Sequence, residues 1–551
     1  MGNDKVMARL LFGLTFGKIS HMLRTISRYI SLSTLLLFLF SSCTRTTSSG
    51  AYPTYDPFAP VNGTNIAPAP ISTGVVAQDS GTPRGATPTR APISVVFVQR
   101  STSGIFVTPT PDSPHPLPSP RTDLDTYTVE AGDTLGSIAQ SYGIMLDALL
   151  QANGLNETSF LAVGQVLNIP PVDSDVQPGS SFKIIPDSEL VYGPAGVNFD
   201  VDGYIQSRGG YLANYVQDVN GEYLTGSQIV QRIAQSYSVN PRLLLALLEY
   251  RSQWVTNSVP SNIDYPMGFF DDYYAGLYRQ LAWTANNLNR GYYLWRVNGI
   301  ATLPMTDNSY VPMSPNINAG TAALQYFLAQ FNNRPVWDLD VSEFGFFLTY
   351  NLLFGYPFDY EIASLLPPGL TQPPMQLPLQ NGTTWSFTGG PHGGWDAGSA
   401  WAALDFAPPG EGGGCDPAPE WVTAVADGFI VRADHGAVIQ DLDNDGYEQT
   451  GWTVLYMHIA TDGRVQPGTY VYAGENIGHP SCEGGVSNAT HLHMARRYNG
   501  EWIPADGSIP FVLDGWVSSG NGVEYDGFLT KGSSIIEAWE GVHEGLNQIS
   551  R

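Results

Sequence analysis

The run Ser-Asn-Ala-Thr-His-Leu-His-Met-Ala, residues 487–495, decides the fold and chemistry expected for the C-terminal part of this chain. Side chains of a β-strand alternate between its two faces. His491 and His493 are therefore expected on one face, with Leu492 on the other face, toward a core. Two imidazoles on the same face indicate a metal centre, in which one binds the ion and the other stays free to transfer protons.

Two residues upstream complete a ligand set for this centre. His392 lies in the glycine-rich run 388–395, and Asp405 is the one carboxylate in the apolar run 399–406, which predicts a buried strand. Two imidazoles and one carboxylate leave a fourth tetrahedral position for water. That arrangement is typical of a catalytic rather than a structural zinc site.

These residues resemble the lysostaphin-like zinc endopeptidases of bacterial cell walls. The usual pattern of that family is His-x-x-x-Asp followed by His-x-His. Here Trp401 stands four residues before Asp405, so the short spacing fails. His392 and Asp405 instead resemble the beta-lytic, staphylolysin-type branch, which has a longer loop between these two ligands.

Two further matches extend this resemblance over residues 380–530. Tyr456-Met457-His458 matches a family histidine that follows a tyrosine on a central strand, and the glycines and aliphatic residues of 468–478 match the hairpin before the His-x-His strand. The resemblance implies a mainly antiparallel β domain that cuts short peptides in wall cross-links. It implies that Zn²⁺ is held by His392, Asp405 and His493, and that the catalytic partners are His458 and His491.

Length and composition indicate an exported protein of several domains. The chain has 551 residues, which predicts three or four domains, and its fold class is expected to be multidomain α+β. Only 14% of residues are charged, and the net charge is −25. Nucleic acid is excluded as a partner because phosphate binding needs a basic face.

The N-terminal residues 1–43 are predicted to be a signal peptide. Arg24 and Arg28 precede the apolar stretch 30–40, which is too short to span a membrane. Small residues before Cys43 resemble a bacterial lipoprotein cleavage box, so Cys43 is expected to carry a lipid anchor in the cell envelope. The alternative is plain secretion. Residues 44–122, rich in Pro, Ser, Thr and Gly, are predicted to be a disordered spacer.

Residues 126–170 are predicted to form a small βααβ unit. The pattern is Val129-x-x-Gly-Asp-Thr-Leu135, Ile138-Ala139, Asn153-x-Leu155 and Gly164-Gln-x-Leu-x-Ile-Pro170. It resembles the lysin motif (LysM), which binds N-acetylglucosamine chains, so this segment is expected to hold the glycan of peptidoglycan.

Residues 185–375 are predicted to form a mainly α-helical domain. Val239-x-Pro-x-Leu-Leu-x-Ala246 and Asn316-x-x-Ala-Gly-x-x-x-Leu324 resemble helices of goose lysozyme and lytic transglycosylases. Where that family has its catalytic Glu, this chain has Arg251, which cannot act as a general acid. Glu249 lies roughly 200° round the helix. The domain is therefore expected to bind glycan without cutting it, with catalysis by Glu249 as the alternative.

Two remaining features concern the loops of the predicted peptidase. Cys415 and Cys482 form an even pair once Cys43 is set aside, and a disulfide is expected in an oxidising compartment, with free thiols or a second metal site as alternatives. Asp441, Asp443 and Asp445 have the oxygen spacing of a Ca²⁺ loop. Trp452 replaces its twelfth-position Glu, so an acidic hairpin turn is the alternative.

The combined hypothesis is a peptidoglycan hydrolase that holds glycan through its LysM segment and cuts peptide through residues 380–530, with 531–551 as a C-terminal tail. Two alternatives stay open at this point. One is a non-enzymatic wall-binding regulator, and the other is a lytic enzyme that cleaves glycan through residues 185–375.

Overall fold

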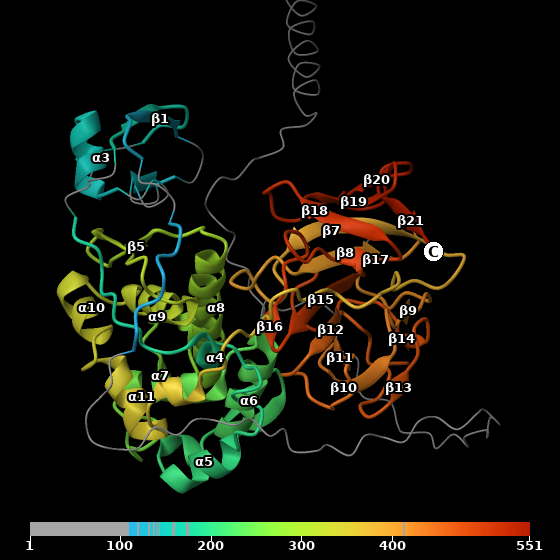
Figure 1. Cartoon of the computed structure of the whole chain (residues 1–551), viewed down its shortest axis with the longest axis horizontal. Coiled ribbons are helices and arrows are strands. Elements are labelled where there is room, and N and C mark those ends of the chain that lie inside the picture. Colours follow the sequence, from blue (N-terminus) through green and yellow to red (C-terminus); the bar gives the residue numbers. More distant parts are fainter. Residues whose placement is uncertain are drawn as a thin grey trace, which may run out of the picture. The chain divides into compact units, whose positions relative to one another are not determined.

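The computed structural model describes residues 109–117, 121–171 with gaps at 130–132, 136–137, 140–141, 143, 157–158 and 160, and 176–551 apart from 411–413. The predicted signal peptide, Cys43 and most of the predicted spacer lie outside the described residues. Within them, a small βα segment, a helical domain and a β domain follow one another along the chain (Figure 1). No helix in this part of the chain is both long and apolar enough to cross a membrane.

The small segment has the strand pairing that the sequence predicts. β1 (Asp125–Thr128) pairs antiparallel with β2 (Val166–Ile169). Helix α3 (Leu146–Asn153) ends at Gly154, whose φ of 63° is the left-handed conformation that glycine adopts at little cost. Leu149, Leu167 and Ile169 are fully buried in its core. The first predicted helix of this segment falls partly outside the described residues.

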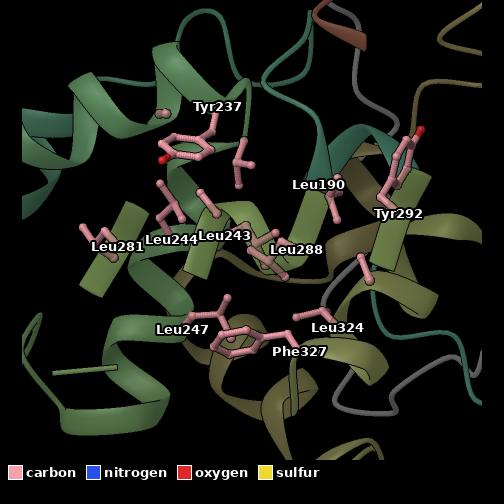
Figure 2. Packing of buried hydrophobic residues seen from close by; sticks show 14 of the residues in the cluster. Leu190, Tyr237, Leu243, Leu244, Leu247, Leu281, Leu288, Tyr292, Leu324 and Phe327 are labelled. Carbon is pink, nitrogen blue, oxygen red and sulfur yellow. The ribbon is translucent and has the colours of Figure 1, made fainter. Parts of the chain in front are cut away.

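The helical domain is organised around α7, a helix that is buried on almost every side. Asn240 caps it by accepting a hydrogen bond from the Arg242 amide, and Pro241 occupies its first turn. Figure 2 shows leucines of α7 packed with residues of α8 and α9. The helices are α4 (Asp187–Leu190), α5 (Val201–Arg208), α6 (Gly226–Tyr237), α7 (Pro241–Ser252), α8 (Leu277–Arg296), α9 (Ala319–Ala329), α10 (Arg334–Asp340) and α11 (Phe346–Phe354). Two hairpins accompany them, β3 (Val216–Val219) with β4 (Glu222–Thr225) and β5 (Thr302–Pro304) with β6 (Tyr310–Pro312).

Part of the predicted spacer lies against the helical domain. Asp112 forms an ion pair with Lys183 at 2.8 Å, and the His115 ring stacks on Trp295 with 4.4 Å between ring centroids. Leu117 packs on the same apolar core. Composition indicated no structure here because these residues have no apolar periodicity of their own. Their partners are supplied by the folded domain.

The β domain is built on one antiparallel sheet with the strand order β13-β10-β11-β12-β15-β8-β7-β21, and β16 pairs with β15. The strands are β7 (Thr384–His392), β8 (Ala403–Ala407), β10 (Gly428–Asp434), β11 (Ala437–Asp441), β12 (Trp452–Met457), β13 (Tyr470–Val471), β15 (Leu492–Tyr498), β16 (Glu501–Trp502) and β21 (Gln548–Ser550). A short antiparallel pair, β9 (Val422–Thr423) with β14 (Asn476–Gly478), accompanies this sheet.

A second antiparallel sheet has the order β17-β18-β19-β20, with β17 (Val512–Leu513), β18 (Trp516–Gly520), β19 (Gly527–Lys531) and β20 (Ser534–Glu537). The prediction of residues 531–551 as a tail outside the β domain is wrong. β20 completes this sheet, and β21 pairs with β7 of the main sheet. Ile549 is buried in the domain core, as are Leu377 and Leu379 before the predicted start at 380. The β domain is thus longer at both ends than its motifs indicated.

Candidate metal centre

Three neighbouring strands bring the predicted ligands together. His392 ends β7, Asp405 is central in β8, and His493 is the second residue of β15. His493 lies directly opposite Asp405 in the β8–β15 pairing, so their side chains share a face. Leu492 is fully buried on the other face, as the alternation in the sequence predicts.

The ligand atoms converge on one oxygen of Asp405. Its Oδ1 lies 3.3 Å from His392 Nε2 and 3.2 Å from His493 Nδ1, and these two nitrogens are 3.0 Å apart. The three ligand atoms therefore fit the spacing of a metal site. Oδ1 is buried and has no hydrogen-bond partner among the described residues. Leaving a buried acceptor unpaired costs about 1–3 kcal/mol, more when it is charged, so this oxygen fits a cation.

The outer nitrogen of each imidazole is held by the backbone. His392 Nδ1 lies 2.8 Å from the Gly390 carbonyl, and His493 Nε2 lies 3.2 Å from the Gly394 carbonyl. A carbonyl only accepts, so each outer nitrogen carries the proton and each inner nitrogen presents a lone pair toward Asp405. Histidines that bind metals are oriented in this way, with the second ring nitrogen donating to a carbonyl or carboxylate.

His491 and His458 lie beside these three residues, and each of them also has one ring nitrogen next to a backbone carbonyl. His491 Nδ1 lies 2.8 Å from the Ala489 carbonyl, and its Nε2 is 3.8 Å from Asp405 Oδ1. His458 Nδ1 lies 3.1 Å from the Glu483 carbonyl. The centroids of the His458 and His491 rings are 4.5 Å apart. Both predicted proton-handling histidines are therefore at the site, each with one ring nitrogen held by a carbonyl.

The backbone of His458 is in an uncommon conformation. Its φ is 66°, a left-handed value that residues with a side chain seldom adopt. The amide and the hydroxyl of Ser481 both donate to the His458 carbonyl, at 2.6 and 3.0 Å. Backbone strain of this kind persists where the surrounding structure fixes it. Ser481 therefore helps to determine the direction of the His458 ring.

Mutual charge and burial set the protonation of the centre. Burial alone would raise the pKa of Asp405, but the imidazoles of His392 and His491 hold that pKa well below its ordinary value. Burial and the neighbouring His491 and His493 put the pKa of His458 well below its usual range. Asp405 is thus a carboxylate and His458 a neutral base near neutral pH.

One aromatic side chain at the site was not predicted from the sequence. The Tyr525 ring stacks on His392, with centroids 4.2 Å apart and planes at 20°. Tyr525 lies on the turn between β18 and β19, in the second sheet, and its φ is 65°. A single tyrosine in a loop has no spacing that distinguishes it. Its position follows from the pairing of strands that were not predicted.

The helical domain places Glu249 and Arg251 in structural roles. The Glu249 carboxylate accepts hydrogen bonds from the amides of Val255 and Thr256, both at 3.0 Å, so it closes the turn after α7. The Arg251 guanidinium lies 4.0 Å from the centre of the Phe331 ring, and its Nε donates to a backbone carbonyl. These contacts favour the expectation that this domain does not cut glycan.

The acidic run after β11 forms a compact turn. Asp441 is buried, and its carboxylate accepts the amides of Asp443, Asn444 and Gly446. Burial and the hydrogen bond to Asp441 raise the pKa of Asp443 to about 8. The oxygens of Asp441, Asp443 and Asp445 are close enough to share an ion. Since much of this carboxylate capacity is used within the turn, calcium binding stays a prediction.

The predicted disulfide is present between Cys415 and Cys482, with 5.1 Å between the Cα atoms. Cys482 directly precedes Glu483, whose carbonyl holds His458. On the other side of the bridge, the Gly414 carbonyl accepts the amide of Thr490, next to His491. The disulfide thus joins two segments that each position one of the histidines beside Asp405.

Comparison with protein families identifies two segments. Residues 127–170 match the model of the LysM domain. This segment is a LysM domain. Residues 183–367 match the model described as LasA, N-terminal domain. The lysozyme resemblance of the helical domain is not tested by this match and stays a prediction. No curated protein matches the chain.

Among solved structures, similar chains include an M23 metalloprotease, lysostaphin and a zinc-containing peptidase. The M23 metalloprotease pseudoalterin, from the deep sea, is 23% identical over 31% of this chain and 98% of its own, with a TM-score of 0.25. The catalytic domain of lysostaphin from Staphylococcus simulans is 26% identical over 22% and 89%, with a TM-score of 0.17. A zinc-containing peptidase from Vibrio cholerae is 17% identical over 25% and 41%, with a TM-score of 0.18.

Proposed function

We propose that this protein is a zinc-dependent endopeptidase that cuts the peptides of bacterial peptidoglycan. The observation that carries the proposal is the buried Oδ1 of Asp405, which faces lone pairs of His392 and His493 and has no hydrogen-bond donor among the described residues. With both imidazoles neutral, this arrangement directs two lone pairs at a carboxylate oxygen, which a bound cation would stabilise. A wall-binding regulator has no need of such a centre with two more imidazoles beside it.

His392, Asp405 and His493 would hold the ion. Bound zinc would lower the pKa of a coordinated water and polarise the scissile carbonyl. His458 is neutral near pH 7 and His491 has one ring nitrogen held by the Ala489 carbonyl, so both are suited to accept a proton from the attacking water and return it to the leaving amine. General acid–base catalysis of this kind contributes roughly 10²–10⁴ in rate.

The LysM domain supports peptidoglycan as the substrate. Glycan held by residues 127–170 would keep the attached peptides near the β domain and raise their effective concentration. Export by the predicted signal peptide, with or without a lipid on Cys43, would deliver the enzyme to the cell envelope.

The proposal is tested with the purified full chain by zinc analysis and by mass spectrometry of products from isolated peptidoglycan. We expect about one zinc per chain and peptides released by endopeptidase cleavage, whose masses identify the bond that is cut. His493→Ala and Asp405→Ala should each lose both the metal and the cleavage, because each removes a ligand.

Glu249→Gln provides the control, since its carboxylate closes a turn in the helical domain and should leave product release unchanged. Release of reducing-end or anhydro sugars that depends on Glu249 would instead identify a glycan-cleaving enzyme. A chain that binds zinc but releases nothing from any peptidoglycan would favour the wall-binding regulator.

A further inference from the structure

The loop between two of the ligands is itself part of the metal centre. This metal-site loop, residues 393–402, connects β7 to β8. Its Gly394 carbonyl faces Nε2 of His493 at 3.2 Å, so the position of the loop determines which nitrogen of His493 is directed at Asp405. The Gly394 amide in turn donates to the Ala400 carbonyl at 3.0 Å, which closes the loop on itself.

The outer end of the metal-site loop is held by the helical domain. Asn286 of α8 accepts the Gly398 amide with its side-chain Oδ1 at 2.6 Å. A Cβ added at Gly398 would lie 2.0 Å from the Asn286 carbonyl oxygen, so the two backbones are in direct contact. The Tyr237 hydroxyl, at the end of α6, donates to the Asp396 carboxylate at 3.1 Å.

Asp396 needs such support because its backbone is strained. Its φ is 62°, a left-handed value that costs an ordinary residue of order 1 kcal/mol or more. Within the loop, its side chain accepts the following amide at 2.7 Å, and its carbonyl accepts the Ser399 hydroxyl at 2.8 Å. The Tyr237 hydroxyl reaches the same carboxylate from outside the loop and so ties the strained residue to α6.

Buried apolar side chains lie beside this half-buried contact. Ala400, Ala402 and Trp502 are buried in the same apolar cluster as the helices of the helical domain, and Tyr237 belongs to that cluster (Figure 2). The Trp502 amide donates to the Tyr293 hydroxyl of α8 at 2.9 Å. Packed interiors transmit small displacements, because they offer few alternative arrangements.

From these contacts we infer that the helical domain helps to position the zinc ligand His493. Asn286 and Tyr237 hold the metal-site loop, and the loop holds the His493 ring. The inference rests on the proposed zinc peptidase and adds a role that glycan binding does not supply. Loss of the Asn286 contact would release Gly398, and then Gly394, so that His493 would no longer be held in the orientation that binds metal.

The test measures the zinc dissociation constant of the full chain by chelator competition, and the absorption spectrum of the Co²⁺-loaded chain. Changes to groups that orient metal ligands typically weaken metal binding by about 10–100-fold. Asn286→Leu removes the acceptor at similar volume and should raise the zinc dissociation constant by about tenfold and alter the Co²⁺ bands. Asn286→Asp keeps an acceptor and should lie nearer to the wild type.

Asn287→Leu is the matched control, since Asn287 is the next residue of α8 and its side chain donates within that helix, to the Trp283 carbonyl. Equal weakening by Asn287→Leu, or an unchanged dissociation constant in Asn286→Leu, would overturn the inference. Should Asn286→Leu fail to fold, Tyr237→Phe removes only a hydroxyl and is judged by the same criteria. A wild-type chain that binds no zinc would instead refute the proposed function.

Discussion

At the residue scale, the histidines of the centre differ in how far the ring nitrogen that faces away from the backbone carbonyl lies from Asp405. The inner nitrogens of His392 and His493 lie within 3.3 Å of Asp405 Oδ1. The Nε2 of His491 is farther from it, at 3.8 Å, and its ring lies beside that of His458. This difference supports a division of labour in which two histidines bind the ion and two transfer protons.

His491→Ala is therefore expected to keep about one zinc per chain and to lose roughly 10²–10⁴ of its activity, the range for a general acid–base group. Zinc content and turnover of a peptide substrate, measured on the same preparation, check this. His493→Ala is the comparison, because it should lose zinc as well. If His491→Ala loses the metal in equal measure, the assignment of zinc binding to His493 alone within the pair is wrong.

Much of this site could be predicted because the type and spacing of its side chains in the sequence indicate a metal centre. Strand alternation placed His491 and His493 on one face, and Asp405 was a single charge in an apolar run. The Gly394 carbonyl and the Tyr525 ring could not be predicted. A backbone acceptor leaves no mark in the sequence, and a stacking ring comes from a separate sheet whose pairing is decided by tertiary contacts.

At the scale of elements, the sequence is most informative where local chemistry sets the boundary. Asn240 and Pro241 mark the start of α7, and Gly154 marks the end of α3. The last two strands, β20 and β21, lie in the segment predicted to be a tail. They were not predicted because each has only a few residues. Runs that short show no alternation long enough to distinguish a strand, and their stability comes from the neighbouring strand.

The disulfide yields a prediction at this scale. Replacing Cys415 and Cys482 together by serine should lower the free energy of unfolding by roughly 2–4 kcal/mol, the usual range for a native bridge. Since the bridge also holds the segments around Glu483 and Thr490, peptide turnover should fall while zinc content stays near that of the wild type. Denaturant titration, zinc analysis and turnover on the same variant check the three parts.

Non-reducing peptide mapping of the wild type supplies the control, and it should recover the two cysteines in one cross-linked peptide. Two alkylatable thiols in the exported protein would contradict the expected bridge. Unchanged turnover in the double serine variant would show that the segments around His458 and His491 are held without it.

At the scale of the whole molecule, the helical and β domains share buried surface that their sequences do not indicate. Ala400 and Trp502 belong to the apolar cluster of the helices, although both lie in the β domain. Motifs and composition divide a chain into segments, but a contact between segments depends on surfaces that form only after each has folded. The position of residues 109–117 against the helices has the same cause.

A titratable group is buried in this shared surface. Glu501 of β16 lies 2.9 Å from Arg296 and 3.3 Å from the Tyr292 hydroxyl, both on α8. Burial raises its pKa to about 7, against the opposing charge of Arg296 and with a smaller contribution from Asp187. An ordinary glutamate has a pKa near 4.5, the value expected in the unfolded chain.

Because the folded pKa of Glu501 is the higher one, the folded state holds a proton between about pH 4.5 and 7 that the unfolded state has released. Its contribution to stability is therefore fully present below about pH 4.5 and is lost as the pH rises through about 7. A difference of one between the folded and unfolded pKa values corresponds to about 1.4 kcal/mol, so the difference between 4.5 and about 7 gives a full loss on the order of 3–4 kcal/mol.

Denaturant unfolding of the wild type and of Glu501→Gln checks this expectation. Relative to Glu501→Gln, which does not titrate at this position, the wild type should lose most of that amount of stability from about pH 5 to about pH 8. Glu540→Gln, at an exposed residue, should keep the wild-type dependence on pH. A constant difference between the wild type and Glu501→Gln would mean that Glu501 is ionised in the folded protein, because its pairing with Arg296 then outweighs its burial.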